Sequence, residues 1–210
     1  MEHRKVLVTH TLLHADKVIT VQGPLSPELL EGLQMHPELD AFRRPLEQKE
    51  ALTEIAGLPE GRIIAAVESN TIVGYVTFHY PDEMELWSQG GMEDLIELGA
   101  VEVANAYRGA GLGRLMIATA FEQGQLENCI VFTTEYYWHW DLKGSGLNVW
   151  AYRQMMEKLM KIVNMVWYAT DDPEICSHPA NCLMVRIGKE VPLASEEMFD
   201  RVRFRQRFMY

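Results

Sequence analysis

A glycine-rich loop between an apolar segment and a helical segment is the feature that most constrains this chain. Residues 98–104 are short, apolar and partly β-branched, which predicts a strand. Residues 108–113 read RGAGLG and place three glycines within five positions, so little side chain stands between the backbone and a ligand. Residues 114–123 contain no proline and predict a helix. A helix that begins at such a loop presents unpaired N–H groups and a positive dipole end, which together favour a phosphate group.

The remaining segments predict a mixed sheet with helices on both faces. Strands are expected over residues 5–11, 17–21, 62–68, 72–80, 128–139, 164–170 and 183–191. Helices are expected over residues 27–35, 46–56 and 148–163, and the tail, 196–210, is interpreted as a helix or a strand. Residues 81–94 are interpreted as a loop or a short helix, and residues 141–146 as a flexible loop. Strands and helices in this order pack best as a sheet covered by helices.

Length, charge and cysteine content exclude several classes of protein. At 210 residues the chain is expected to form one domain, 1–210. The formal net charge of −11 argues against nucleic-acid binding, which relies on Lys and Arg to meet phosphates. No run approaches the ~20 apolar residues of a membrane span, and the first residues have no signal-peptide pattern. Three widely spaced cysteines fit a reducing compartment, so a cytoplasmic location is expected.

The loop also carries a family resemblance. Residues 108–113 resemble the acyl-CoA-binding signature of the GNAT superfamily of N-acetyltransferases, which is Arg or Gln, two residues, Gly, one residue, then Gly or Ala. The loop follows a predicted strand, opens a helix and lies past the predicted strands 62–68 and 72–80, which read as a hairpin, as that family requires. A dinucleotide-binding pattern would have G-x-G-x-x-G in the first βα unit, and a P-loop would continue with Gly-Lys-Ser/Thr. Neither pattern fits this chain.

The resemblance implies a fold and a co-substrate. The implied fold is mixed α/β, with a central, mostly antiparallel sheet in which two neighbouring strands splay apart and helices flank the sheet. An insertion near residues 81–96 and a C-terminal extension at 192–210 would be added to this single acetyltransferase domain. The implied co-substrate is acetyl-CoA, with no metal, bound mainly through backbone groups. The residues expected to contact it are Val101, Val103, Arg108, Gly109, Ala110, Gly111, Leu112, Gly113, Arg114 and Asn148.

The resemblance extends over the full length to protein lysine acetyltransferases of this superfamily. It implies a protein substrate, acetyl-CoA synthetase, whose acetylation on a lysine would inactivate it and so control acetate and acetoin metabolism. Two alternatives remain open. The chain could acetylate a small amine, or it could bind acetyl-CoA synthetase as a stoichiometric inhibitor. No nucleic acid or membrane partner is expected. A zinc site at Cys176, His178 and Cys182 is not expected, because no fourth ligand has matching spacing.

Acetyl transfer to a lysine needs a base, because an ammonium is not a nucleophile until it loses a proton. Glu97 lies eleven residues before Arg108, where protein lysine acetyltransferases of this superfamily place their base glutamate. Glu102 is the second candidate, because a carboxylate inside an apolar strand must face a site or a partner. Strict alternation would put these two side chains on opposite faces, although a bulge would change that. Glu135 and water are the remaining alternatives.

The leaving thiolate needs a proton donor. Many family members use a tyrosine that lies seven residues after an asparagine on the last long helix. Asn148 and Ala151 fit that pattern, but the tyrosine position holds Met155. Tyr152 is the nearest substitute, and release of the thiolate without a dedicated acid is the alternative. The backbone N–H of Val103 is the candidate donor to the thioester carbonyl, which becomes an oxyanion during transfer.

Overall fold

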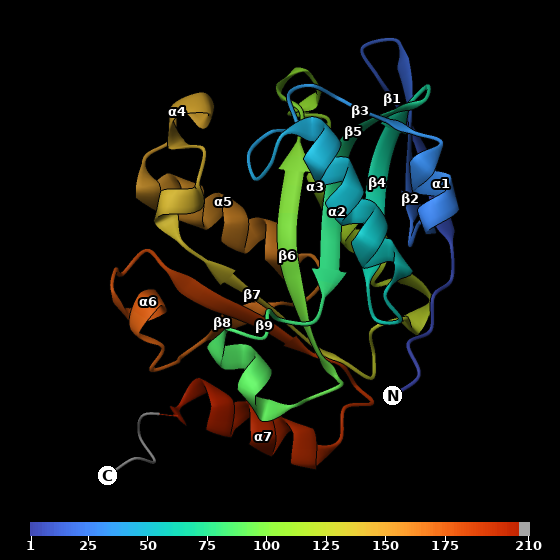
Figure 1. Cartoon of the computed structure of the whole chain (residues 1–210). Coiled ribbons are helices and arrows are strands. Elements are labelled where there is room, and N and C mark those ends of the chain that lie inside the picture. Colours follow the sequence, from blue (N-terminus) through green and yellow to red (C-terminus); the bar gives the residue numbers. More distant parts are fainter. Residues whose placement is uncertain (206–210) are drawn as a thin grey trace. The chain divides into compact units, whose positions relative to one another are not determined.

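A computed structural model describes residues 1–205, and the contacts among them divide the chain into two compact units (Figure 1). The first unit comprises Met1–His79 and Leu98–Gln125. The second comprises Tyr80–Glu97 and Leu126–Tyr210, of which residues 206–210 lie outside the described part. The described residues form nine strands, and one of them, β6 (Leu95–Val103), contributes residues to both units.

The first unit is a sheet with helices packed on it. Its strands follow the order β1-β2-β4-β5-β6, and β1, β2, β4 and β5 pair antiparallel. The strands are β1 (Val8–His14), β2 (Lys17–Gly23), β4 (Arg62–Glu68) and β5 (Thr71–His79), and a short β3 (Gln34–Met35) pairs parallel with β5. Residues 62–67 of β4 are buried at every position. Side chains alternate between the two faces of a strand, and none is exposed here, so both faces of β4 are covered. This confirms the predicted sheet with helices packed on it.

Two α-helices of this unit, α2 (Pro45–Gly57) and α3 (Leu112–Ala120), cover the sheet, and α1 (Pro27–Glu31) packs against α2. Helix α2 packs on β4 and β5 and lies in front of the strands in Figure 1. Helix α3 packs on β2, β4 and β5. Two 3₁₀ turns, η2 (Asn105–Tyr107) and η3 (Glu122–Gly124), flank α3. These contacts anchor α3 in the core and therefore hold its first turn in place.

The second unit is built on a smaller mixed sheet. Leu95–Glu97 of β6 pairs parallel with β7 (Ile130–Glu135), which pairs antiparallel with β9 (Cys182–Ile187), and β9 pairs antiparallel with β8 (Val166–Tyr168). The helices are η1 (Leu86–Gly90), η4 (Tyr137–His139), α4 (Leu142–Ser145), α5 (Val149–Lys161), α6 (Pro173–Cys176) and α7 (Leu193–Arg203). Trp87 packs against Phe132 and Phe199 at ring-centroid distances of 5.1 and 6.1 Å, and this aromatic contact joins η1 and α7 to the sheet.

Three predicted segments differ from the structure, and a fourth, the tail, takes one of its two predicted forms. The helix expected over 27–35 ends at Glu31 and gives way to β3, because the Gln34 N–H donates to Asn70 O at the edge of β5 and no longer continues a helix. The strand expected over 128–139 ends at Glu135 and continues as η4. The loop at 141–146 contains α4, capped by the Asp141 side chain. The tail is a helix from Leu193 to Arg203, and the prediction for 206–210 falls outside the described residues.

Two features are absent from the described part of the chain. Within residues 1–205, no helix combines the length and the apolar character that crossing a membrane requires. The same residues contain no group of three or more His, Cys, Asp or Glu side chains placed to hold a metal ion. Cys176 and Cys182 are both unpaired by disulfides, the first exposed and the second buried.

Candidate functional site

The loop before α3 has the backbone geometry of an anion site. Gly109 and Gly111 have φ angles of 85° and 77°, in the left-handed region that side chains rarely adopt. A Cβ at either position would meet nothing within 4 Å, so the glycines serve the backbone conformation and leave the loop open. Gly111 is the N-cap of α3, and no side chain caps this helix. The first backbone N–H groups of α3 therefore have no intrahelical acceptor and suit the oxygens of a phosphate.

The charged and apolar neighbours of this loop come from the same unit. Arg108 and Arg114 flank the glycines and are both exposed. Val101 packs under the loop, since a Cβ at Gly113 would lie 3.8 Å from its Cγ1. The structure thus brings together, within the first unit, nine of the ten residues expected to contact acetyl-CoA; the tenth, Asn148, belongs to the second unit. Their contact with acetyl-CoA itself stays a prediction.

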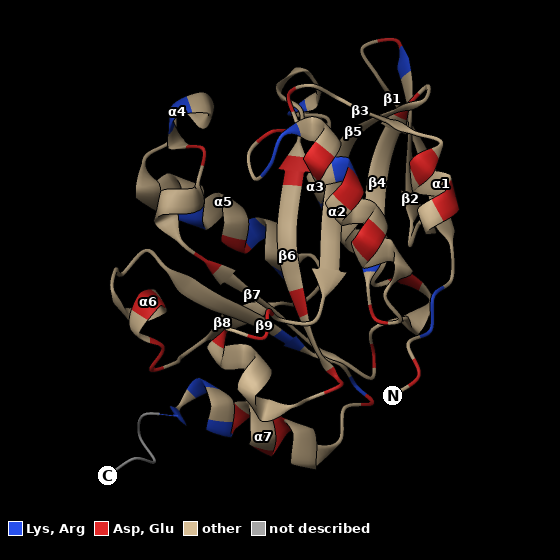
Figure 2. Cartoon of the chain, in the orientation of Figure 1, with Lys and Arg blue, Asp and Glu red and all other residues tan. Residues whose placement is uncertain are grey.

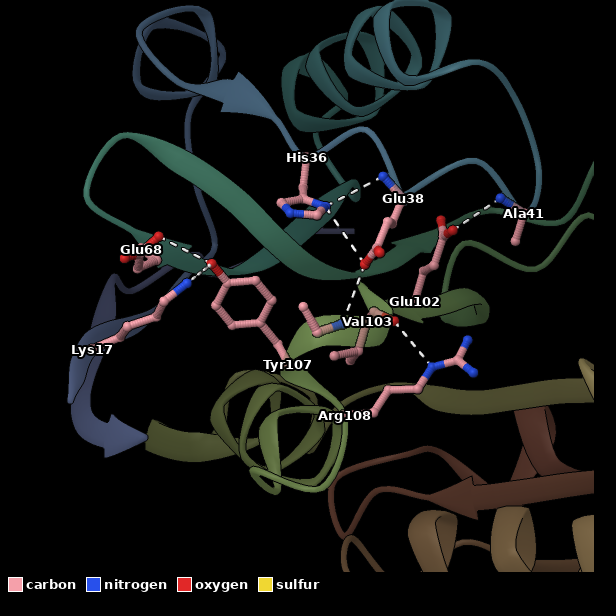
Figure 3. Close-up of polar contacts among 10 residues, drawn as sticks. Lys17, His36, Glu38, Ala41, Glu68, Glu102, Val103, Tyr107 and Arg108 are labelled. Atoms are coloured by element: carbon pink, nitrogen blue, oxygen red, sulfur yellow. Dashed lines mark hydrogen bonds and ion pairs between the residues drawn. The ribbon is translucent and has the colours of Figure 1, made fainter. Parts of the chain in front are cut away.

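The end of β6 is joined to the loop by a short hydrogen-bonded strap, residues 103–108. Ala104 N–H donates to Val73 O at 2.9 Å, and Tyr107 N–H donates to Ala104 O at 2.9 Å. Arg108 Nε donates to Val103 O at 3.4 Å, so the arginine side chain folds back on the strand end (Figure 3). Val103, the candidate oxyanion donor, therefore lies on a segment whose position is determined by its own hydrogen bonds.

Glu102 is buried and both of its carboxylate oxygens accept hydrogen bonds. The Tyr75 hydroxyl donates to Oε2 at 2.5 Å. The Ala41 N–H donates to Oε1 at 2.9 Å (Figure 3). Burial, and then the hydrogen bond to Glu102, raises the pKa of Tyr75, so this hydroxyl keeps its proton. Neither Tyr75 nor Ala41 belongs to a recognisable motif, so the sequence alone does not reveal either partner of Glu102.

Glu97 belongs to the second unit and has a different environment. It is the last residue of β6 that pairs with the parallel strand β7, and it lies opposite Phe132. Burial raises the pKa of its carboxyl to about 8, and the negative charges of Glu85 and Asp82 add to this increase. Among the described residues its carboxylate has no hydrogen-bond partner. Figure 2 shows acidic segments towards both ends of the β6 ribbon, where the sequence places Glu97 and Glu102. A carboxylate with a pKa near neutrality is suited to general base catalysis.

A second buried carboxylate, Glu135, ends strand β7. It accepts a hydrogen bond of 2.8 Å from the Trp140 indole, and burial raises its pKa to about 7 although that bond lowers it. Tyr152, the candidate acid, stacks on Trp140 with ring centroids 5.2 Å apart and an angle of 18° between the planes. Cys182 pairs with Glu135 across the sheet, and burial together with the Glu135 charge raises the pKa of its thiol to about 12. Trp140 therefore links Tyr152 to a buried acid, a connection that the sequence did not reveal.

The asparagine pattern of α5 has a structural explanation. Asn148 is the N-cap of this helix, and its Oδ1 accepts a hydrogen bond of 2.9 Å from the Ala151 N–H. Asn148 and Ala151 therefore form the cap that starts the helix. Met155, at the position of the family tyrosine, is exposed. The contact of Asn148 with acetyl-CoA and the role of Tyr152 as an acid both stay predictions.

Sequence and structure comparisons show which known proteins this chain is similar to. Residues 31–139 match the family described as "Acetyltransferase (GNAT) family". Two proteins named acetoin utilization protein AcuA, from Bacillus subtilis (strain 168) and Bacillus licheniformis, are each 57% identical over 210 residues, which is 100% of this chain and 100% of each relative. The crystal structure of an acetoin utilization protein from Exiguobacterium sibiricum 255-15 is 50% identical with a TM-score of 0.95, and the match covers 99% of this chain and 98% of that one.

Proposed function

This chain belongs to the GNAT family of acetyltransferases, and we propose that it transfers the acetyl group of acetyl-CoA to the ε-amine of a protein lysine. The family resemblance that residues 108–113 indicated is confirmed, and the chain is an acetyltransferase of the AcuA type. Acetyltransferases of this family use acetyl-CoA. The lysine acceptor and the roles of individual residues are the proposal.

Acetyl-CoA binding would rest on the first unit. The open N-terminus of α3 and the left-handed glycines before it supply the backbone donors for the pyrophosphate. The two exposed arginines beside the loop add positive charge in a chain of net charge −11. The strand end at Val101 and Val103 offers its backbone to the pantetheine amides, and the Val103 N–H would stabilise the oxyanion that forms on the thioester carbonyl.

The observation that carries the chemistry is the raised pKa of Glu97, about 8, in a carboxylate that no described residue satisfies. Glu97 would accept a proton from the lysine ammonium, and the free amine would attack the thioester carbon. The attacking nitrogen then loses its second proton to solvent, the carbon–sulfur bond breaks, and the coenzyme A thiolate leaves. Tyr152 is the candidate donor of a proton to that thiolate, with solvent as the alternative. No covalent acetyl-enzyme is needed, so the transfer is direct.

We propose acetyl-CoA synthetase as the protein substrate, inactivated by acetylation of its lysine, with both proteins in the cytoplasm. The supporting observation on this chain is the acidic group at Asp82 and Glu85, whose charges act on Glu97. Such charges attract a lysine-bearing surface and increase the association rate. Three cysteines without a disulfide agree with a reducing compartment.

Transfer of label from acetyl-CoA tests the proposal. Purified protein is incubated with labelled acetyl-CoA and acetyl-CoA synthetase, beside Gly111→Trp and a matched control, Gly146→Trp. Both glycines have left-handed φ angles, 77° and 67°, and open space for a Cβ, so the two variants carry the same backbone strain. We expect label on one lysine with the wild type and the control, and none with Gly111→Trp. Label on small amines alone, or inhibition of the synthetase without label, would refute protein lysine acetylation.

A further inference from the structure

We infer that Glu102 is a positioning residue that, together with Glu38, clamps residues 36–41 onto the strap that carries Val103 and leads to the acetyl-CoA loop. The inference rests on the proposed function, since it assigns to the clamp the affinity for acetyl-CoA. It assigns proton transfer to Glu97 and removes Glu102 from the candidates for the base.

The first half of the clamp lies directly before Val103. Glu102 connects two elements that are distant in sequence, because Tyr75 is on β5 and Ala41 lies in the segment before α2. The Tyr75 side chain is 0% exposed and Glu102 is 7% exposed. Hydrogen bonds to a buried carboxylate are shorter and stronger than those between neutral groups, so this contact determines where the strand end lies.

The second half lies directly after Val103. Glu38 Oε2 accepts a hydrogen bond of 3.2 Å from the Ala106 N–H. The His36 ring meets the Tyr107 ring edge-on, with centroids 5.7 Å apart. Leu39, between these two contacts, is 0% exposed and anchors the segment in the core. Figure 3 shows the contacts of residues 36–41 on both sides of Val103.

Tyr107 extends the clamp to the far side of the strap. Its hydroxyl donates to Glu68 Oε2 at 3.0 Å and accepts from Lys17 Nζ at 2.9 Å (Figure 3). Tyr107 is buried and immediately precedes Arg108, the first residue of the loop. The strap is therefore held by side chains from β2, β4 and residues 36–41 and by the Val73 carbonyl of β5, which limits its motion when a ligand binds.

The same contacts make Glu102 unsuited to accept a proton from a substrate. Both carboxylate oxygens already accept hydrogen bonds, from a buried hydroxyl and a backbone N–H. Glu102 is only 7% exposed, and taking up a proton would remove the charge that strengthens both hydrogen bonds, which is unfavourable for a buried group. Glu97 has no such partner among the described residues, so its lone pairs are available.

Two substitutions at one position separate positioning from proton transfer. In Glu102→Gln the amide oxygen still accepts from Ala41 N–H, and the Tyr75 hydroxyl accepts from the amide NH₂. Glu102→Ala removes both contacts. Coenzyme A affinity is measured by calorimetry, and kcat and KM for acetyl-CoA are measured from pH 6 to 9. The matched control is Glu50→Ala, an exposed glutamate on α2.

We expect Glu102→Gln to stay within about threefold of wild type in kcat, KM and pH profile, and Glu102→Ala to weaken coenzyme A binding by roughly tenfold. Glu38→Ala should weaken it by roughly threefold, because one exposed contact is lost, and Glu50→Ala should have no effect. A loss of roughly 100-fold or more in kcat for a folded Glu102→Gln, with coenzyme A affinity unchanged, would overturn the inference, because that loss is typical of a missing base.

The readouts also distinguish this inference from the proposed function. If the wild type acetylates no lysine, the proposed function fails, while the coenzyme A affinities still test the clamp. Should Glu102→Ala not fold, Tyr75→Phe removes one of its hydrogen bonds with little change in volume and is measured in its place. The clamp would be refuted if coenzyme A affinity were unchanged in both Glu102→Ala and Glu38→Ala, or in both Tyr75→Phe and Glu38→Ala.

Discussion

Replacing Glu97 by Gln should abolish most of the activity and at the same time stabilise the protein at alkaline pH. The amide cannot accept a proton, so we expect kcat to fall by about 10²-fold or more. In the wild type, with a Glu97 pKa of about 8, the rate should rise with pH up to that value. About one tenth of the carboxyls would be ionised at pH 7.

The stability effect follows from the same pKa. The pKa of Glu97 is raised in the folded state above its ordinary value of 4.5, so the carboxyl is favourable to folding only while it is protonated. Between pH 4.5 and about 8 the folded protein binds one more proton than the unfolded chain, and the free energy of unfolding falls as pH rises. Below pH 4.5 both states are protonated and the effect disappears.

The magnitude is large enough to measure. Each pKa unit corresponds to about 1.4 kcal/mol. Glu97 is only partly buried by surface area, so the stability effect is smaller than the full pKa shift would give. We expect the free energy of unfolding of Glu97→Gln to exceed that of the wild type by about 2–4 kcal/mol at pH 9.

Urea unfolding at pH 4, 7 and 9, with initial rates of acetyl transfer at each pH where the protein is folded, tests both effects. Glu157→Gln serves as a control for the loss of one carboxylate on α5, with an i,i+4 ion pair and no part in the proposed chemistry. A Glu97→Gln variant that keeps the wild-type rate, or a stability difference that does not grow between pH 4 and pH 9, would refute the reasoning.

Two further predictions concern packing. Gly61→Ala should lower the free energy of unfolding by about 2–4 kcal/mol, because its Cβ would collide with the Ile55 carbonyl. Gly57→Ala, at the end of α2 where a Cβ has ordinary space, should be neutral or stabilising by about 0.5 kcal/mol. Urea unfolding that ranks the two variants the other way would contradict the structure. Trp140→Phe keeps an aromatic ring but removes the donor to Glu135, so the pKa of Glu135, about 7, should rise further, and stability above that pH should fall by about 1–3 kcal/mol. An unchanged titration of Glu135, followed by nuclear magnetic resonance, would exclude this hydrogen bond.

Local patterns predicted some elements well. Strand β4 matches its predicted bounds, and α2 and α5 differ from theirs by one or two residues, because each has a continuous apolar pattern between clear start and stop signals. The helix predicted over residues 27–35 was wrong in its last part, because the contact that decides the structure there is not local. Its apolar pattern continues past Gly32, but the hydrogen-bond partner that turns residues 34–35 into a strand is on β5, far along the chain.

At the candidate site, the two glutamates of β6 show the same difference between what local sequence predicts and what distant contacts decide. The sequence placed Glu97 and Glu102 on one strand and left their roles open. Tertiary structure surrounds Glu102 with a hydroxyl and a backbone donor, and leaves Glu97 beside other negative charges. Those neighbours come from residues 41 and 75 for Glu102, and from residues 82 and 85 for Glu97. The order of residues along the strand contains no information about them.

What the sequence determined by itself is the glycine loop and the helix that follows, hence the family and the prediction that this segment binds phosphate. Backbone conformation at Gly109 and Gly111 depends on residue type and near neighbours, so it can be predicted locally. Tertiary structure alone decided which carboxylates are satisfied and which have a raised pKa. Desolvation and charge interactions arise from residues that only folding brings together, and here they distinguish Glu97 from Glu102.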